Sequence, residues 1–175
     1  MISSGGLSTD VLRATGGCAW RRDDPGESPD RKGQTTMTDT AHQRLQEADG
    51  LAAVLDAAYE AFEGMLSVIH PVQDPASDQF AAFVMAAASA ANGRNALALA
   101  PSLPGHPLLA VPAERQPWSG EPPERVAEVV AGLSHLAAER LADAAASAPD
   151  TSDVAACRDA AQSAREICGL LSTRP

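Results

Sequence analysis

The 175-residue sequence has few aromatic residues, few cysteines and a single lysine, Lys32. It contains two Trp, one Tyr and three Phe, and only three Cys. No apolar run reaches the roughly 18 residues of a membrane-spanning helix, so we expect no membrane span. Three cysteines do not make a disulfide framework, which favours a cytoplasmic location. No alternating pattern typical of strands exceeds four residues, which argues against a sheet protein.

Motifs that carry known chemistry are also absent from the sequence. There is no nucleophile motif G-x-S-x-G, no phosphate-binding loop and no dinucleotide-binding glycine pattern. Di-iron helical bundles use Glu-x-x-His pairs, and none occurs here. The histidines are scattered, and only His135 shares a helix face with a carboxylate, that of Glu139. We therefore predict no catalytic residue, no metal site and no cofactor, and we lean towards a protein that is not an enzyme.

Alanine and acidic residues are abundant. The chain has 36 alanines, a formal net charge of −10 and a pI near 4.7. Residues 1–36 hold five basic and five acidic side chains, so the whole negative charge belongs to residues 37–175. Phosphate groups repel a strongly acidic protein. We therefore expect neither nucleic acid nor an anionic membrane surface as a partner.

Residues 1–36 differ in composition from the rest of the chain. Gly, Ser, Thr, Asp and Arg dominate them, without sustained hydrophobic periodicity. They lack the basic start and the apolar stretch of a secretory signal. We expect a disordered N-terminal extension here and a helical domain over residues 37–175. Because Met37 and the residues after it resemble a natural N-terminus, we hypothesise that translation of the native protein begins at Met37 and not at Met1. Mass spectrometry of the native N-terminus tests this hypothesis.

The first expected helix covers residues 40–70. Thr40 and Gln43 have the spacing of a capping box at its start, and His70-Pro71 ends it. Apolar residues recur along it at alternating steps of three and four, which is the spacing of a heptad seam. These positions are Leu45, Ala48, Ala52, Leu55, Tyr59, Phe62, Leu66 and Ile69.

The second expected helix begins after Asp74-Pro75 or at Ser77. Asn92-Gly93 predicts a stop or a kink in it. Its apolar spacing predicts one inner face, made of Phe80, Phe83, Val84, Ala87 and Ala91.

The third helix is expected to begin at Pro122-Pro123 and to end at Pro149, and one of residues 150–152 caps the fourth. Each helix has one apolar stripe. The stripes are Val126, Val130, Leu133, Ala137, Leu141 and Ala144 in the third, and Val154, Cys157, Ala161, Ala164, Cys168 and Leu171 in the fourth. Because Cys157 and Cys168 would lie about 16 Å apart along one helix, we expect two buried thiols and no disulfide between them.

These patterns predict an all-α fold, an antiparallel four-helix bundle with a long Pro-rich loop over residues 101–120 between helices 2 and 3. Alanine-lined seams let helices approach closely, but they bury little apolar area. A second copy would add buried area. We therefore expect a homodimer, or a complex with an unidentified protein partner.

Two groups of carboxylates repeat at helical spacing. They are Asp56, Glu60 and Glu63, and Glu121, Glu124 and Glu128. Carboxylates that lie close together can raise one another's pKa and build an acid–base site. We prefer the simpler interpretation, in which both groups lie on solvated outer faces.

The Pro-rich loop supplies the candidate contact residues. Seven of the 13 prolines fall within residues 101–123. His106, Arg115 and Trp118 are our candidate contacts for a partner or a ligand, because Trp and Arg are common at interface hot spots. The simpler interpretation, which we prefer for the loop itself, is that residues 108–111 and Trp118 fold back and plug the end of the bundle.

Two functions fit these observations. We prefer a non-catalytic helical bundle that acts through protein–protein contacts. The alternative is a small-molecule-binding or catalytic bundle with a pocket between the helices, near Phe62, Phe80 or Phe83. A closed cavity with Tyr59 or His135 pointing into it would favour the alternative, and a solid core would remove most of its support.

Overall fold

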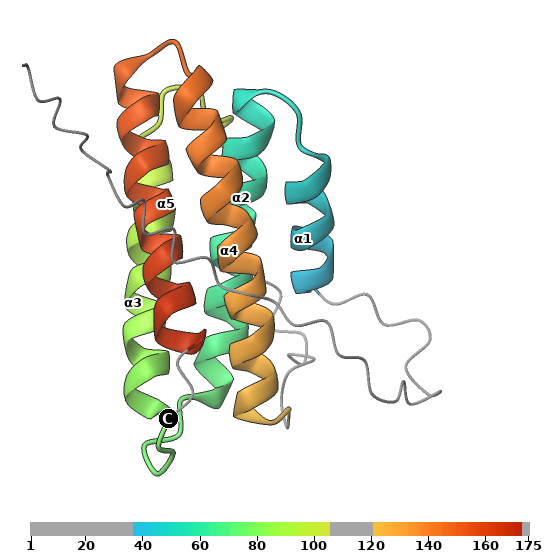
Figure 1. Cartoon of the computed structure of the whole chain (residues 1–175), viewed down its shortest axis with the longest axis vertical. Coiled ribbons are helices and arrows are strands. Elements are labelled where there is room, and N and C mark those ends of the chain that lie inside the picture. The colour runs from blue at the N-terminus through green and yellow to red at the C-terminus, as the bar shows by residue number, and fades with distance from the viewer. Residues whose placement is uncertain (1–36, 106–120, 173–175) are drawn as a thin grey trace, which may run out of the picture.

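The computed structural model describes residues 37–105 and 121–172, and its regular elements over these residues are all helical (Figure 1). The prediction of an all-α fold is therefore confirmed. The elements are α1 (Met37–Glu47), α2 (Leu51–Ile69), the short 3-10 helix η2 (His70–Val72), α3 (Phe80–Leu97), α4 (Pro123–Ser147) and α5 (Thr151–Ser172).

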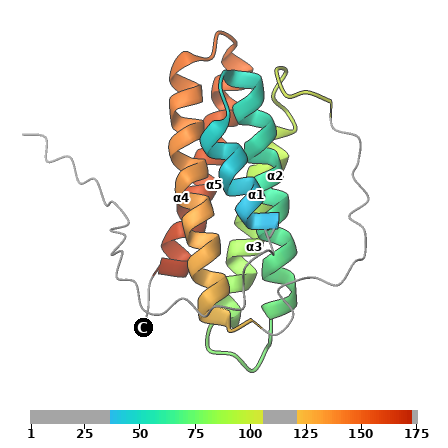
Figure 2. The ribbon, with the colours of Figure 1, turned by 90° about the vertical axis from the view of Figure 1, so that its right-hand side faces the viewer.

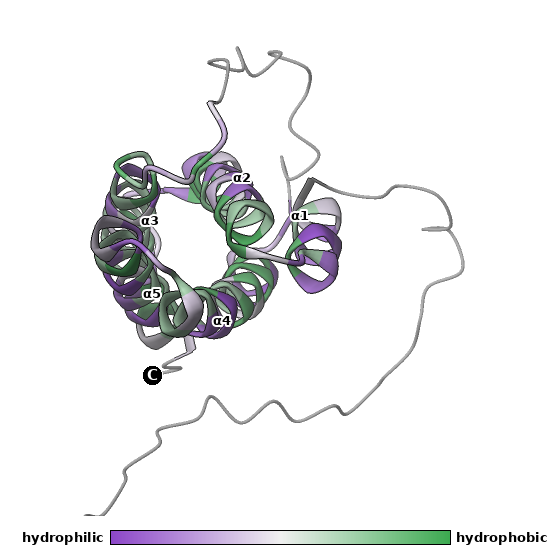
Figure 3. Ribbon diagram, turned by 90° about the horizontal axis from the view of Figure 1, so that it is seen from above, coloured by the Kyte–Doolittle hydropathy of each residue, from purple (hydrophilic) through white to green (hydrophobic). Residues whose placement is uncertain are grey.

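Helices α2 to α5 surround a common interior. α2 packs against α3 and α4, and α5 packs against the same two helices. α1 lies outside this group, against α2 and α4, as the view from above in Figure 3 and the side view in Figure 2 show. The helical part of the chain thus has four central helices and one peripheral helix.

The first predicted helix is two helices in the structure, because the helix is interrupted between Glu47 and Leu51, at Gly50. This residue precedes α2 with a φ of 78°, a left-handed conformation that glycine adopts without strain. Of the predicted seam, Leu45, Leu55, Phe62 and Ile69 are buried on the two sides of this break, but Ala52 in the first turn of α2 is exposed. The predicted capping box is also wrong, since Thr40 lies inside α1.

The second predicted helix begins at Phe80, after a turn over residues 74–79, and continues to Leu97. The stop predicted at Asn92-Gly93 is therefore wrong. Gly93 is buried in the helix, and a Cβ atom on it would lie 2.4 Å from Cζ of Phe62. The glycine allows α3 to approach the Phe62 ring closely, and it does not end the helix.

The helices predicted from Pro122-Pro123 and from residues 150–152 are confirmed as α4 and α5. All six positions of the α4 stripe are buried. Just before α5, the Asp150 carboxylate accepts a 2.6 Å hydrogen bond from the backbone N–H of Ser152. This hydrogen bond lowers the pKa of Asp150, because it stabilises the charged form.

The buried apolar residues form one cluster to which all five α-helices contribute. Roughly half of these residues are alanines, and the largest fully buried side chains are those of Phe62 and Phe83. The interior is therefore lined mostly by small side chains, as the alanine content predicts. None of the helices in the described residues is long and apolar enough to cross a membrane.

Candidate interaction surface

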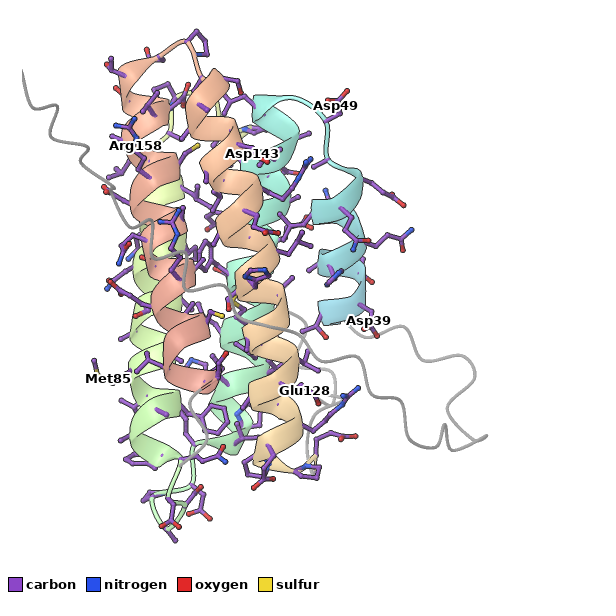
Figure 4. All side chains as sticks on the ribbon, viewed as in Figure 1. Asp39, Asp49, Met85, Glu128, Asp143 and Arg158 are labelled. Carbon is purple, nitrogen blue, oxygen red and sulfur yellow. The ribbon has the colours of Figure 1, made fainter. Side chains whose placement is uncertain are left out.

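Large apolar side chains are exposed on the outer face of α3. In the described part of the chain, the well-exposed large hydrophobic residues are Val84 (40%), Met85 (56%) and Leu99 (80%). Met85 projects from the outer side of α3, away from the other helices (Figure 4). Single exposed apolar residues are common, whereas a contiguous apolar patch is typical of interaction sites, which makes this side of α3 the candidate surface.

These residues belong to a continuous row of exposed positions, which we call the α3 stripe. Its positions are separated by one to four residues, so they share one side of the helix and of the turn that follows it. The stripe consists of Ala81, Val84, Met85, Ala88, Asn92, Asn95 and Leu99, all of them exposed.

The α3 stripe carries no charged group. In a chain of net charge −10, residues 79–113 contain no Asp or Glu. The only cation of α3, Arg94, donates a 2.9 Å hydrogen bond to Glu63 of α2. The outer face of α3 is therefore neutral on a molecule that is otherwise acidic.

The neighbouring carboxylate on α5 is also engaged. Glu166 accepts hydrogen bonds from the Ser89 hydroxyl of α3 and from the Gln162 side chain, each 3.2 Å long. Two carboxylates that flank α3, those of Glu63 and Glu166, are thus held by partners within the molecule.

Sequence reasoning missed this surface. It assigned Val84 to the inner face, whereas the buried residues of α3 include Phe83, Ala86 and Ala90. The helix is apolar on nearly all sides, so periodicity alone could not separate the inner face from the outer one. The usable signal was the absence of acidic residues from residues 79–113.

The contact residues predicted from the sequence, His106, Arg115 and Trp118, lie outside the described residues. The same holds for the interpretation in which residues 108–111 plug the bundle. Both stay predictions. The N-terminal segment 1–36 is also outside the described residues.

The start of the connection between α3 and α4 is held against the helices. Ala100 is buried and Leu103 packs against the core. Asp153 in the first turn of α5 is fully buried, and it accepts hydrogen bonds from the Ser102 backbone N–H (3.1 Å) and the Ser102 hydroxyl (2.7 Å). These hydrogen bonds attach the segment that follows α3 to the start of α5. Asp153 was not identified from the sequence.

Cys157 and Cys168 are both buried and unbridged, as predicted. Burial raises the pKa of the Cys157 thiol, and the nearby Asp153 carboxylate raises it further. A thiol in such surroundings is mostly protonated at neutral pH and reacts slowly. The buried-core interpretation of Cys157 is the one that these surroundings support.

The first group of predicted surface carboxylates forms ion pairs between helices. Arg44 of α1 pairs with Asp56 (2.9 Å) and Glu60 of α2, while Glu63 pairs with Arg94 of α3. All three acids are half-buried. The three acids are thus partly solvated, and Arg44 pairs with two of them and Arg94 with the third.

α4 binds the end of α1 through Arg140. Its guanidinium donates to the backbone carbonyls of Leu45 (3.1 Å) and Ala48. The last carbonyls of a helix have no partner within the helix, and a cation stabilises them. Arg140 therefore attaches the peripheral helix to the central ones.

The residues proposed to line a pocket occupy different surroundings. Phe62 and Phe83 are fully buried, Tyr59 and Phe80 are half-buried, and His135 is 34% exposed beside Glu139 at 3.5 Å. The backbone of Gly93 fills the space against the Phe62 ring. Within the described residues there is no group of three or more His, Cys, Asp or Glu side chains that could hold a metal ion.

Comparison with family models, with curated proteins and with solved structures finds no match for this chain.

Proposed function

We propose that this chain is a non-catalytic helical protein that acts through protein–protein contacts made by the α3 stripe. The observation that carries the proposal is the exposure of the adjacent Val84 and Met85, and of Leu99 in the turn after α3, along one uncharged side of an acidic molecule. Burying such side chains against a partner contributes about 25 cal/mol per Å² of apolar surface. An acidic, charge-covered exterior elsewhere directs contact to this face.

The fold that presents the stripe is, in this proposal, an antiparallel four-helix bundle of α2 to α5 with α1 added on its outside. Support comes from the packing of α2 against α3 and α4, and of α5 against the same two helices. Residues 148–150 join α4 to α5, and residues 70–79, which include η2, join α2 to α3; connections as short as the first are typical of antiparallel neighbours. Such a bundle leaves the outer face of each helix available for contact.

We propose that the protein acts in the cytoplasm. The buried, unbridged thiols of Cys157 and Cys168 support a reducing compartment. Cell fractionation followed by immunoblotting with an antibody against the full chain tests the location.

Photo-crosslinking in the cells that make the protein tests the contact function. A photoreactive amino acid replaces Met85 on the α3 stripe or, as the matched control, Ala155 on the exposed side of α5. We expect discrete higher-mass adducts from position 85 and few from position 155. Equal adduct patterns at the two positions, or none at either, would contradict the proposal.

A further inference from the structure

We infer that the partner of the α3 stripe is a second copy of this chain, packed with its own α3 antiparallel to the first about a twofold axis. This inference rests on the proposed function and names its partner. The arguments are the charge distribution of the molecule, the symmetry of the stripe and the charges at the two ends of α3.

Electrostatic repulsion between two copies limits which surfaces can form a dimer contact. Each copy carries −10, so contact through most surfaces brings carboxylates together. Residues 79–113 supply no carboxylate, and the flanking Glu63 is compensated by its ion pair with Arg94, while Glu166 keeps its charge beside the neutral side chains of Ser89 and Gln162. Contact between two copies through the α3 stripe therefore brings fewer carboxylates together than contact through a charge-covered helix face would.

The apolar part of the stripe is self-complementary. Ala81, Val84, Met85 and Ala88 are placed symmetrically about the midpoint between Val84 and Met85. A twofold axis through this point sets Val84 of one copy opposite Met85 of the other, and Ala81 opposite Ala88. Large side chains then meet at the centre, and alanines on both sides let the helices approach closely.

The ends of α3 favour the antiparallel direction. The turn before the helix carries the exposed acids Asp74 and Asp78, whereas the last turns carry Arg94 and the exposed amides of Asn92 and Asn95. A parallel pair would place the acidic turns of both copies together. An antiparallel pair separates the acidic turns of the two copies and places each beside the partner's exposed Asn92 and Asn95 amides, which can donate hydrogen bonds to carboxylates.

The length of the stripe limits the area that a dimer can bury, and we use this area to estimate the strength of association. From Ala81 to Leu99 it spans about 27 Å at 1.5 Å per residue. One helix face of this length buries less than the roughly 800 Å² per partner of a standard interface. We therefore expect a dimer with a dissociation constant in the micromolar range.

Sedimentation equilibrium of the full chain over about 1 to 200 µM measures this association. Ala88→Glu places two like charges in the interface, and we expect it to weaken dimerisation at least about tenfold. Ala155→Glu is the matched control, because it makes the same substitution at an exposed position of α5. It should dimerise like the original chain, and circular dichroism checks that both variants keep their helices.

A charge-swap variant tests the antiparallel register. When Ala81→Glu is combined with Ala88→Arg, the new carboxylate at position 81 of each copy faces the new guanidinium at position 88 of the other, twice in the dimer. We expect this double variant to dimerise to within a few-fold of the original chain, while Ala81→Glu combined with Ala88→Glu is monomeric. Failure of the charge-swap variant to dimerise would overturn the antiparallel register.

The outcomes separate this inference from the proposed function. A chain that is monomeric at every concentration, or a dimer that Ala88→Glu leaves unchanged, overturns the inference. Cross-linking at position 85 to a different protein would also overturn it, while the proposed contact function would stand. Loss of all adducts at position 85 would defeat both.

Discussion

Gly93 brings the backbone of α3 against the Phe62 ring of α2, and no larger residue fits there without movement. A Cβ atom at this position would lie within 3.0 Å of three atoms of the ring. Phe62 is fully buried, so it has little room to move away. The glycine is therefore required by packing between two helices, although its sequence context, Asn-Gly, is that of a helix end.

We predict that Gly93→Ala destabilises the protein by about 1–3 kcal/mol, because overpacking exceeds the gain in helix propensity. Gly169→Ala is the control: this exposed glycine of α5 has open space around it, so the same change should stabilise by about 0.5–1 kcal/mol. Denaturant unfolding measures both. In a Phe62→Leu background the cost of Gly93→Ala should shrink; an unchanged cost would exclude the ring as its cause.

Cys157 makes stability depend on alkaline pH. Burial, and then the Asp153 carboxylate, raises the pKa of this thiol in the folded protein above its value in the unfolded chain. The stabilising contribution is fully present below the unfolded pKa and is lost as the pH rises above it. We predict a falling free energy of unfolding above about pH 8.5. The decline should be shallower in Cys157→Ala, and an identical decline in this variant would contradict the assignment.

α1 is an element whose position depends on side chains of other helices. It is short and polar, and Arg140 of α4 and the acids paired with Arg44 hold it in place. Isolated helices of this length are marginal in water. We therefore regard α1 as the helix most dependent on its contacts.

We predict that Arg140→Ala speeds amide hydrogen exchange in α1 about tenfold, because the carbonyls of Leu45 and Ala48 lose their donor. Exchange in α5 should stay unchanged. Arg125→Ala serves as the control, since Arg125 pairs only with Glu128 on the same helix among the described contacts. If exchange in α1 rises equally in both variants, Arg140 does not hold the helix.

The elements differ in how far the sequence predicts them. All six positions that periodicity predicted for the α4 stripe are buried, because this helix is amphipathic and uninterrupted. Periodicity misplaced Ala52, because the chain leaves the helical conformation at Gly50 and Ala52 then lies exposed in the first turn of α2, whereas apolar spacing alone predicts one continuous helix. It misplaced Val84, because α3 is apolar on both its inner and its outer side.

At the level of the molecule, the sequence predicts the all-α class. It does not predict which helices pack against one another or that the α3 stripe is exposed. The α3 stripe can be identified only from the burial of each residue, because residue type alone does not distinguish a buried alanine or valine from an exposed one. Likewise, the ion pairs of Asp56, Glu60 and Glu63 depend on which helices become neighbours. Local patterns determine the elements, and packing between distant segments determines the candidate site.

Salt should strengthen self-association. Because each copy carries −10 and the α3 stripe is uncharged, raising the salt concentration screens repulsion without weakening the contact itself. We predict that the association constant rises several-fold between about 50 and 300 mM NaCl, measured by sedimentation equilibrium. The charge-swap variant provides the contrast, since its added Glu–Arg pairs make it less responsive. Weaker association of the original chain at high salt would indicate a charged interface instead.

The alanine-lined interior also determines how stability responds to temperature. Unfolding raises the heat capacity in proportion to the apolar surface that it exposes. Alanines expose little, and they make up roughly half of the buried apolar residues. The heat-capacity change per residue should therefore fall below the roughly 12–15 cal/mol/K of ordinary domains. The stability curve of this protein would then be less strongly curved, so that cooling below the temperature of maximum stability costs less than it does in ordinary domains.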